Sequence, residues 1–122
     1  MDVYVNSIEY KEDGRVIYHT GLYFELPKDY EMEIRPRSSN TKTMAIMPNS
    51  PGTLDAGYRG ELMIVYRNII NPKLSLTYYS IGDRIAQILI RKREKIVWDE
   101  VKNKEDLLNS DRGEGGFGST GK

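Results

Sequence analysis

Cysteine is absent from this sequence of 122 residues, and histidine occurs once, at His19. The lack of cysteine excludes disulfides, thiolate nucleophiles and Cys-ligated zinc. One histidine is too few for a His-rich metal site, and we interpret His19 as a packing or surface residue. No apolar run approaches the roughly 20 residues that a membrane span requires, and the N-terminus does not resemble a signal peptide. We therefore expect a cytoplasmic protein without membrane contacts.

An excess of charge of either sign is also missing, because 18 Lys and Arg residues balance 18 Asp and Glu residues. Proteins that bind nucleic acid usually present a broad basic face. A nucleic-acid partner is therefore not expected. The length suits one domain with a real but modest core.

Short stretches of alternating apolar and polar residues run along most of the chain. A period of two is typical of strands with one buried face. The alternation predicts strands over residues 22–26, 30–35, 62–67, 74–79 and 85–90. Turn residues, among them Asp13-Gly14 and Gly82-Asp83, separate these stretches. Many short strands with turns between them predict an all-β sandwich or barrel.

The C-terminal part of the chain differs in composition. Residues 104–108 suit a brief helical turn, and from Ser110 onward glycine and polar residues dominate. Such a composition favours a flexible arm. We therefore expect a β domain over residues 1–109 and a flexible Gly-rich arm over residues 110–122.

One polar cluster, Pro36-Arg37-Ser38-Ser39, directly follows a predicted strand. The guanidinium offers a planar fork of donors and each hydroxyl adds another, so the cluster suits phosphate oxygens. The same residues are equally suited to an ordinary polar turn. A site and a plain turn both remain open from this pattern.

A second cluster spans residues 49–62, NSPGTLDAGYRGEL. Pro51-Gly52 predicts a tight turn between two extended arms, and the free backbone groups of such a hairpin can pair with the edge of a base. Asp55 lies beside the turn as a candidate general base for a water molecule. In the alternative interpretation, Asp55 is a surface turn residue and Tyr58 an ordinary strand aromatic.

Two further clusters lie near the C-terminus. In GDRIAQ, residues 82–87, we interpret Asp83 and Arg84 as a structural ion pair or turn, and Gln87 as a carboxamide available to a ligand. The arm carries a cation, an aromatic ring and two hydroxyls: Arg112, Phe117, Ser119 and Thr120. These side chains could close over a nucleotide; in the alternative interpretation, the arm is simply a disordered tail. Its end matches part of the P-loop pattern, but no helix-forming segment follows Lys122 in this sequence.

Taken in order, these four clusters resemble motifs of the trimeric dUTPase family. The matching stretches are PRSS at 36–39, NSPGTLDAGYRGEL at 49–62, GDRIAQ at 82–87 and RGEGGFGSTG at 112–121. Their order and spacing both fit, and they cover nearly the whole chain. The resemblance implies a jelly-roll subunit, a homotrimer with shared active sites, and Mg²⁺-dependent hydrolysis of dUTP to dUMP and pyrophosphate.

The resemblance also implies roles for the residues at matching positions. Asp55 matches the base that activates water. The substrate-binding positions that it implies are Arg37, Ser38, Ser39, Asn49, Gly52, Leu54, Tyr58, Gln87, Arg112, Phe117, Gly118, Ser119 and Thr120. Among these, the hairpin positions hold uracil, Tyr58 packs against the deoxyribose, and the arm forms a lid that often reaches a neighbouring subunit's site.

The first motif of the family is usually Ala-Gly-x-Asp-Leu-x-Ala, preceded by a further strand. Asp2-Val3-Tyr4-Val5 falls close to the Asp-Leu-x-Ala position. The resemblance therefore implies that Asp2 reaches the magnesium ion through water, and that the first strand of the family is missing or shortened here.

Two other functions fit the same sequence less well. A non-catalytic dUTP-binding or regulatory module would keep the fold without turnover. A relative of dCTP deaminase would need an acid near the base, and Glu61 is the only obvious acid of the hairpin region. Asp55 and the GFGSTG arm favour hydrolysis over both.

Overall fold

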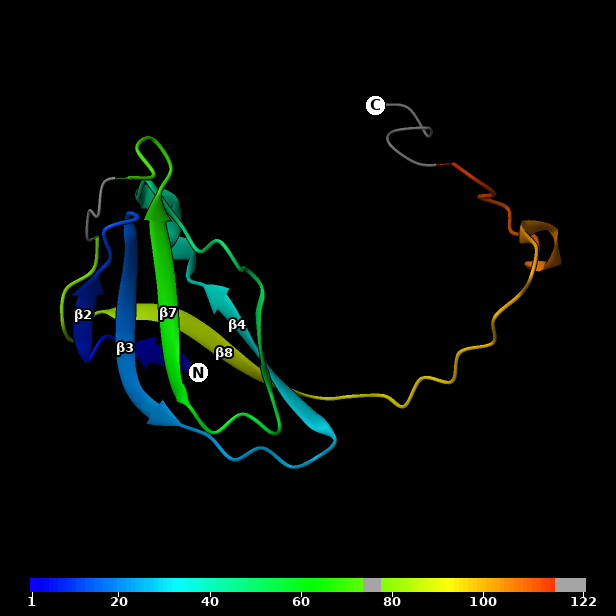
Figure 1. The fold of residues 1–122 in the computed structure, drawn as a ribbon, viewed down its shortest axis with the longest axis horizontal. Helices are drawn as coiled ribbons and strands as arrows, with labels where there is room; N and C mark the ends of the chain where they lie inside the picture. Colours follow the sequence, from blue (N-terminus) through cyan, green and yellow to red (C-terminus); the bar gives the residue numbers. More distant parts are fainter. Residues whose placement is uncertain (74–77, 116–122) are drawn as a thin grey trace.

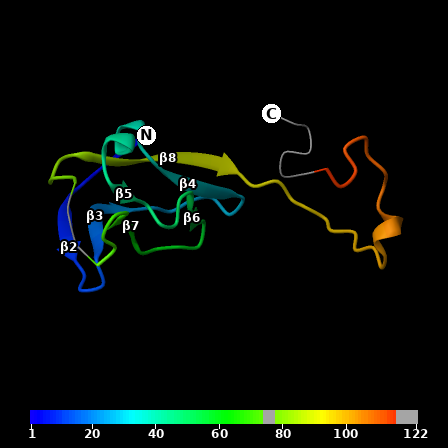
Figure 2. The same ribbon diagram turned by 90° about the horizontal axis from the view of Figure 1, so that it is seen from above.

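The computed structural model describes residues 1–73 and 78–115. Within these residues the chain forms two antiparallel sheets of four strands each, ordered β1-β8-β4-β6 and β2-β3-β7-β5. The two sheets lie as separate layers, which are clearest when the molecule is viewed from above (Figure 2). The predicted all-β sandwich is confirmed.

Each sheet draws its strands from distant parts of the sequence (Figure 1). The first sheet contains β1 (Asp2–Tyr4), β4 (Tyr30–Pro36), β6 (Gly52–Asp55) and β8 (Arg84–Lys92). The second contains β2 (Ser7–Tyr10), β3 (Arg15–Tyr23), β5 (Ala45–Ile46) and β7 (Glu61–Asn68). Two 3₁₀ turns, η1 (Ser38–Lys42) and η2 (Lys104–Asp106), complete the described elements. Neither of these helical turns is long or apolar enough to cross a membrane.

The core lies between the sheets and is filled by the apolar residues of the alternating strands. On β4, Met32 and Ile34 are buried, as the alternation predicts, and on β7 Leu62, Ile64 and Tyr66 are buried in the same way. Three tyrosine rings meet in this core with centroids 5.5 to 6.0 Å apart: Tyr18, Tyr66 and Tyr79. Such tilted and edge-to-face contacts add to the stabilisation from burial.

Two predicted strands differ from those observed. The strand predicted over 22–26 is the end of β3, which stops at Tyr23 because its partner β7 begins opposite, at Glu61. In the strand predicted over 85–90, Ile85 and Ala86 are both buried, which breaks the alternation. The register between β1 and β8 shifts at this point, so the extra residue forms a β-bulge. The prediction over 74–79 falls largely outside the described residues.

After β8 the chain leaves the two sheets. Residues 93–115 extend away from the β body and include η2, where the predicted helical turn is confirmed (Figure 1). Arg93 still donates its backbone N–H to the carbonyl of Asp29, at 2.7 Å. Beyond Arg93, the hydrogen bonds and ion pairs among the described residues are formed within the segment itself.

Candidate active site

A cavity of about 190 Å³ is formed by β4, β6, the turn after β6 and the start of β7. Four of the positions predicted for catalysis or substrate binding line it: Asn49, Leu54, Asp55 and Tyr58. The other lining residues are Ile34, Thr53, Glu61, Leu62 and Met63. The structure thus places the predicted general base beside three of the four positions predicted to bind uracil and deoxyribose; the fourth, Gly52, does not line the cavity. Met63 and Thr53 were not anticipated, because only the pairing of the strands places them there.

Strand β6 supplies the cavity with both side chains and backbone. It pairs with β4 along one side, from Glu31 opposite Asp55 to Ile34 opposite Gly52. It is the outermost strand of its sheet, so its other edge has no partner strand among the described residues. An edge of this kind offers backbone donors and acceptors to a ligand.

The predicted turn at Pro51-Gly52 is wrong in position. The turn lies earlier, where the Ser50 N–H donates to the carbonyl of Met47 at 3.0 Å, and Gly52 is already the first residue of β6. The pairing of Gly52 with Ile34 draws it into the sheet. Asn49 therefore belongs to the turn that leads into the edge strand.

Asp55 ends β6 and is exposed. Within the described parts of the chain, its carboxylate has no hydrogen bond or ion pair, while its backbone carbonyl accepts the Tyr58 N–H at 3.0 Å. The turn is therefore fixed by the backbone, and the carboxylate is left available to water at the cavity.

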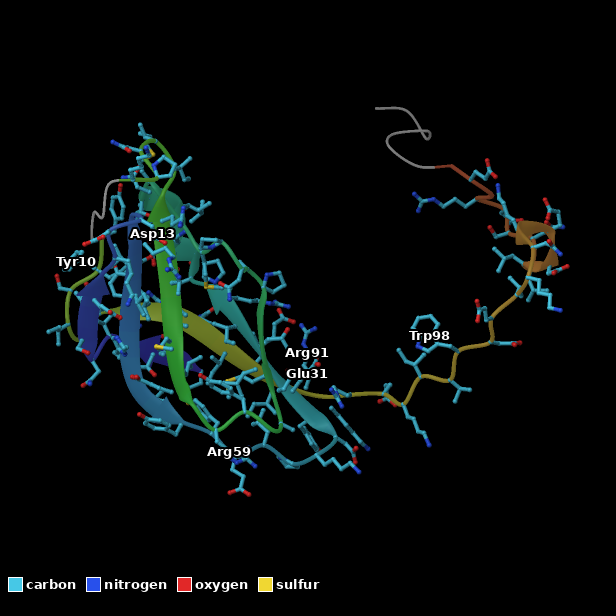
Figure 3. All side chains as sticks on the ribbon, in the orientation of Figure 1. Tyr10, Asp13, Glu31, Arg59, Arg91 and Trp98 are labelled. Atoms are coloured by element: carbon cyan, nitrogen blue, oxygen red, sulfur yellow. The ribbon has the colours of Figure 1, made fainter. Side chains whose placement is uncertain are left out.

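The ring of Tyr58 is fixed by the residues that follow it. Its hydroxyl donates to the backbone carbonyl of Glu61 at 3.0 Å, and a Cβ atom added to Gly60 would lie 2.3 Å from that hydroxyl oxygen. Only glycine leaves room for the ring in this position. Arg59 closes the same loop by donating to the carbonyls of Ala56 and Tyr58, and its side chain points away from the body (Figure 3).

A second group of predicted residues gathers at Asp2 in strand β1. One carboxylate oxygen accepts hydrogen bonds from Arg37 Nε at 3.1 Å and from Gln87 Nε2 at 3.2 Å. The other lies 3.6 Å from Arg84 Nη1. Partial burial favours protonation, but the hydrogen bonds from Gln87 and Arg37 and the two guanidinium charges together hold the pKa of Asp2 below its ordinary value. Asp2 is therefore firmly ionised near neutral pH.

The β-bulge explains why Arg84 belongs to this group. Residues three apart on a regular strand face opposite sides, but the extra residue at Ile85 brings Arg84 and Gln87 to the same side. Of the two interpretations offered for Asp83 and Arg84, an ion pair or a turn, the structure has the turn, since Arg84 pairs with Asp2 instead. Asp83 does form the predicted turn, because its carboxylate accepts the Ser80 N–H at 2.8 Å.

The residues predicted to bind phosphate start the 3₁₀ turn η1. Arg37 donates through Nη1 to Ser39 Oγ at 3.3 Å, and Ser38 is exposed beside it. Arg37 and Ser39 also line a second cavity of about 300 Å³ together with Thr43, Tyr78, Tyr79, Asp83 and Arg84. Asn40 holds η1 in place by accepting the Tyr79 hydroxyl and donating to the carbonyl of Ala45.

The two groups lie at opposite ends of β4. Asp55 is opposite Glu31, near the start of β4, whereas Arg37 follows Pro36 at its end. Glu31 and Pro36 are five positions apart along β4, which corresponds to about 16 Å of strand. Within one chain, therefore, the group around Asp55 and the group around Asp2 do not form a single pocket.

The described part of the arm, residues 110–115, forms no hydrogen bond or ion pair with either group in this chain. Arg112 donates through Nε to the carbonyl of Gly115 at 2.8 Å, within the extended segment. The remaining predicted arm residues, Phe117, Gly118, Ser119 and Thr120, lie outside the described residues. Trp98 and Leu108 of the segment are 86% and 97% exposed, and Figure 3 shows Trp98 far from the sheets.

His19 lies on β3 with its side chain 27% exposed, as expected of a packing or surface residue, and it also contacts two carboxylates. Its Nδ1 atom lies 2.9 Å from Glu61 Oε2, and its Nε2 atom lies 3.5 Å from Glu9 Oε2. Nothing in the local sequence indicates this pair, because His19 and Glu61 meet only through the pairing of β3 with β7.

A model of the dUTPase family matches residues 2–121. The chain belongs to the dUTPase family. A deoxyuridine 5'-triphosphate nucleotidohydrolase of Leptospira interrogans is 46% identical over 112 residues, covering 90% of this chain and 74% of that protein. The protein of the same name from Anaplasma marginale is 42% identical over 109 residues, covering 88% of this chain and 70% of that protein.

Solved structures support the fold. A mutant of the Staphylococcus bacteriophage 80alpha dUTPase with dUpNHpp has a TM-score of 0.74 at 23% identity, over 98% of this chain and 84% of that one. A mutant dUTPase of phage phi11 of S. aureus, described with a structural Mg(II) ion, has a TM-score of 0.64 at 20% identity, over 85% of this chain and 83% of that one. The chain therefore has the jelly-roll β fold of dUTPases.

Proposed function

We propose that this protein is a dUTP diphosphatase, which hydrolyses dUTP to dUMP and pyrophosphate. The observation that carries the proposal is the cavity at β6, where Asn49, Leu54, Asp55 and Tyr58 converge in a chain of the dUTPase family. The named function of the two bacterial relatives supports the same conclusion.

Asp55 acts as the general base. Its carboxylate is exposed and unpaired among the described residues, so it accepts a proton from a water molecule held beside it. That water forms a bond to the α-phosphorus of dUTP, and the bond between this phosphorus and the bridging oxygen breaks, so that pyrophosphate leaves. This reaction needs positioning and charge stabilisation more than a covalent nucleophile, in keeping with the absence of cysteine.

The phosphates bind near Asp2. The residues that contact them are Arg37, Ser38, Ser39 and Gln87. Arg37 and Gln87 already donate to a carboxylate, so both side chains are arranged to meet anionic oxygens. Hydroxyls of Ser38 and Ser39 lie at the exposed start of η1. Together they supply a guanidinium, a carboxamide and two hydroxyls to a polyphosphate.

Asp2 fits a magnesium ion held mainly by the substrate. Mg²⁺ is commonly bound through one or two carboxylates, water and substrate phosphates. Asp2 is ionised, and the described residues contain no group of three acidic or histidine side chains that would hold a metal alone. When bound, Mg²⁺ would neutralise phosphate charge, and Asp2 would accept hydrogen bonds from its water ligands.

Specificity arises at the edge strand and at Tyr58. The free backbone edge of β6, together with Asn49, pairs with the uracil edge, and Gly52 and Leu54 belong to the same stretch. The ring of Tyr58 packs against the deoxyribose and leaves no room for a 2′-hydroxyl. A cytosine edge would leave a buried amide unpaired, at a cost of about 1–3 kcal/mol for each mismatch.

We further propose a homotrimer with active sites shared between subunits. The separation of the Asp55 and Asp2 groups by about 16 Å of strand supports this arrangement, because a site completed by a second chain avoids the gap. The extended segment also carries Ile96, Val97 and Trp98 in exposed positions, which favours their burial against another subunit.

The arm of residues 110–122 serves as a lid over the nucleotide. Arg112 is the γ-phosphate ligand and Phe117 the ring over uracil, with Gly118, Ser119 and Thr120 completing the phosphate contacts. Residues 1–109 form the β domain in this scheme. A cytoplasmic location and the absence of a nucleic-acid partner stay predictions from the sequence.

The two alternatives are less well supported. The deaminase hypothesis assigned its acid to Glu61, but both carboxylate oxygens of Glu61 are engaged, one by His19 and the other by the Gly21 N–H. Asp55 places an unpaired carboxylate at the cavity. A non-catalytic module would have no need of such a group, whereas hydrolysis requires it.

Pyrophosphate release from dUTP, dCTP, dTTP and UTP, each with Mg²⁺ and with EDTA, tests the proposal. We expect Mg²⁺-dependent release from dUTP alone. Binding of dUTP without release would favour the non-catalytic module, and release of ammonia from dCTP would favour the deaminase.

A further inference from the structure

The pairing of β3 with β7 is interrupted directly beside the nucleotide cavity. His19 lies opposite Met63 and Tyr23 opposite Glu61, so three residues of β3 lie across from one residue of β7. At this irregularity Gly21 has a φ of +69°, and the Thr20 hydroxyl donates to the carbonyl of Leu62 at 2.6 Å. The ladder is replaced here by side-chain hydrogen bonds.

Glu61 joins the two strands across the irregularity. One oxygen of its carboxylate accepts the Gly21 N–H at 2.8 Å, and the other lies 2.9 Å from His19 Nδ1. Its side chain is 19% exposed and that of His19 is 27% exposed, so the pair is partly shielded from water. A shielded charged hydrogen bond is stronger than one on the open surface.

The same residue also fixes the ring at the cavity. The backbone carbonyl of Glu61 accepts the Tyr58 hydroxyl at 3.0 Å, and both residues line the cavity. A continuous series of contacts therefore runs from His19 through Glu61 to Tyr58. His19 itself does not line the cavity.

We propose that His19 is a positioning residue for nucleotide binding, which in its protonated form holds Glu61, and through it Tyr58, in the arrangement that receives the sugar. This inference rests on the proposed function. It goes further in assigning a role to the single histidine and in making affinity for the nucleotide depend on pH.

The charged groups around His19 favour its protonated form. Glu61 faces it from β7 and Glu9 from β2, and Lys11 is paired with Glu9. The hydrogen bond with Glu61 raises the pKa of His19 above its ordinary value; partial burial opposes the rise, and the charges of Glu61 and Glu9 add to it. A neutral imidazole can keep one N–H toward Glu61, but it has lost its charge, so the charge-assisted hydrogen bond to Glu61 becomes an ordinary and weaker one.

The direction of the pH effect follows from this raised pKa. When folding raises the pKa of a group, the protonated group stabilises the folded state, and this stabilisation is complete below the ordinary pKa, near 6.5 for histidine. The stabilisation is lost as the pH rises through the pKa that the group has in the folded protein. Nucleotide affinity is therefore expected to be highest on the acidic side and to fall as His19 loses its proton.

Kinetics of two His19 variants test the role. At pH 6, His19→Leu should raise KM for dUTP by about tenfold, the effect of one hydrogen bond, with kcat changed less than about twofold. The wild-type KM should rise towards the variant's value as the pH rises, whereas that of His19→Leu should not change. His19→Asn keeps a neutral donor near the Nδ1 position, so its KM should be intermediate and independent of pH.

Titration by NMR gives a readout independent of turnover, because the chain contains one histidine. Binding of dUpNHpp should raise the pKa of His19. If protonation of His19 increases the affinity for the nucleotide, thermodynamic linkage requires that the bound nucleotide increases the affinity of His19 for its proton. In Glu61→Gln the pKa should fall and its response to dUpNHpp should disappear. Glu9→Gln is the matched control, because it removes the second acid but leaves the contact with Glu61, so KM should stay near the wild-type value.

The outcomes separate the two proposals. If the wild-type protein hydrolyses dUTP, equal KM values for wild type and His19→Leu, or a His19 pKa that ignores dUpNHpp, overturn the positioning role alone. If the wild-type protein neither hydrolyses nor binds dUTP, the proposed function fails and the positioning role fails with it. If His19→Leu does not fold, the kinetics of His19→Asn and the NMR titration of the wild-type protein still test the positioning role.

Discussion

The backbone, and not any contact of its own side chain, places Asp55, the residue proposed as the general base. Its position comes from the pairing of β6 with β4 and from the turn closed by the Tyr58 N–H. The carboxylate itself is unpaired among the described residues and exposed. An isosteric change there should therefore alter the chemistry without altering the fold.

We expect Asp55→Asn to lower kcat for dUTP by about 10²- to 10⁴-fold, the usual contribution of a general base, with KM little changed. Steady-state kinetics with a pyrophosphate assay measures both. Glu12→Gln, which removes an exposed acid at the turn between β2 and β3, is the control and should keep full activity. Full activity of Asp55→Asn would show that another group activates the water.

At the scale of elements, the turn between β6 and β7 sets the geometry of the cavity. Its two glycines have different surroundings: a Cβ on Gly60 would meet the Tyr58 hydroxyl at 2.3 Å, whereas a Cβ on Gly57 would meet nothing within 4 Å. The obstructing atom belongs to a side chain that can rotate. A methyl group at Gly60 should therefore move the Tyr58 ring rather than unfold the turn.

Gly60→Ala should raise KM for dUTP by about tenfold or more, because the Tyr58 hydroxyl loses its hydrogen bond to Glu61 and its ring leaves the sugar position. Gly57→Ala, in the same turn, is the matched control and should behave as the wild type. Kinetics and thermal unfolding of both variants check this. Equal KM values for the two would mean that the ring of Tyr58 does not contact the substrate.

At the scale of the whole molecule, the exposed apolar segment after β8 is the feature that a single chain leaves unexplained. Ile96, Val97 and Trp98 follow one another along extended backbone outside the sheets (Figure 1). Contiguous exposed apolar groups favour association with another protein surface. The proposed homotrimer supplies that surface and also brings the separated site groups together.

We expect a solution mass close to three times 14.1 kDa by analytical ultracentrifugation. The single tryptophan, Trp98, should then show the blue-shifted emission of a buried indole, although it is exposed in the isolated chain. Trp98→Asp should weaken the trimer and reduce activity in parallel, whereas Lys102→Asp, at an exposed polar position of the same segment, should do neither. A monomer with full activity would contradict the shared site.

Removal of residues 112–122 tests the arm at the same scale. We expect a folded trimer whose kcat/KM for dUTP falls by about 100-fold or more, because the lid residues position the substrate and exclude water. Removing only Gly121 and Lys122 is the control and should have little effect. Unchanged activity after the longer truncation would contradict the lid.

The sequence by itself determined the fold class and the positions of β4, β7 and β8, and it indicated most of the residues now proposed for the two site groups. Alternation decides which residues of β4 and β7 face the core, since burial of apolar groups is the main driving force and the strand repeat is two. The residue types made Asp55 and Arg37 candidates for a base and a phosphate ligand, and the resemblance of the motifs to the dUTPase family added Tyr58. The roles in binding phosphate and metal stay proposals that rest on the same motifs.

Only the tertiary structure decided which of these residues meet. The β-bulge at Ile85 brings Arg84 to Asp2, and the irregular pairing of β3 and β7 brings His19 to Glu61. The pairing of β6 with β4 places Asp55 and Arg37 at opposite ends of β4. Register joins residues far apart in the sequence, and a shift of one residue reverses the face of every side chain beyond it. The local pattern therefore specifies the strands, and the long-range pairing specifies the site.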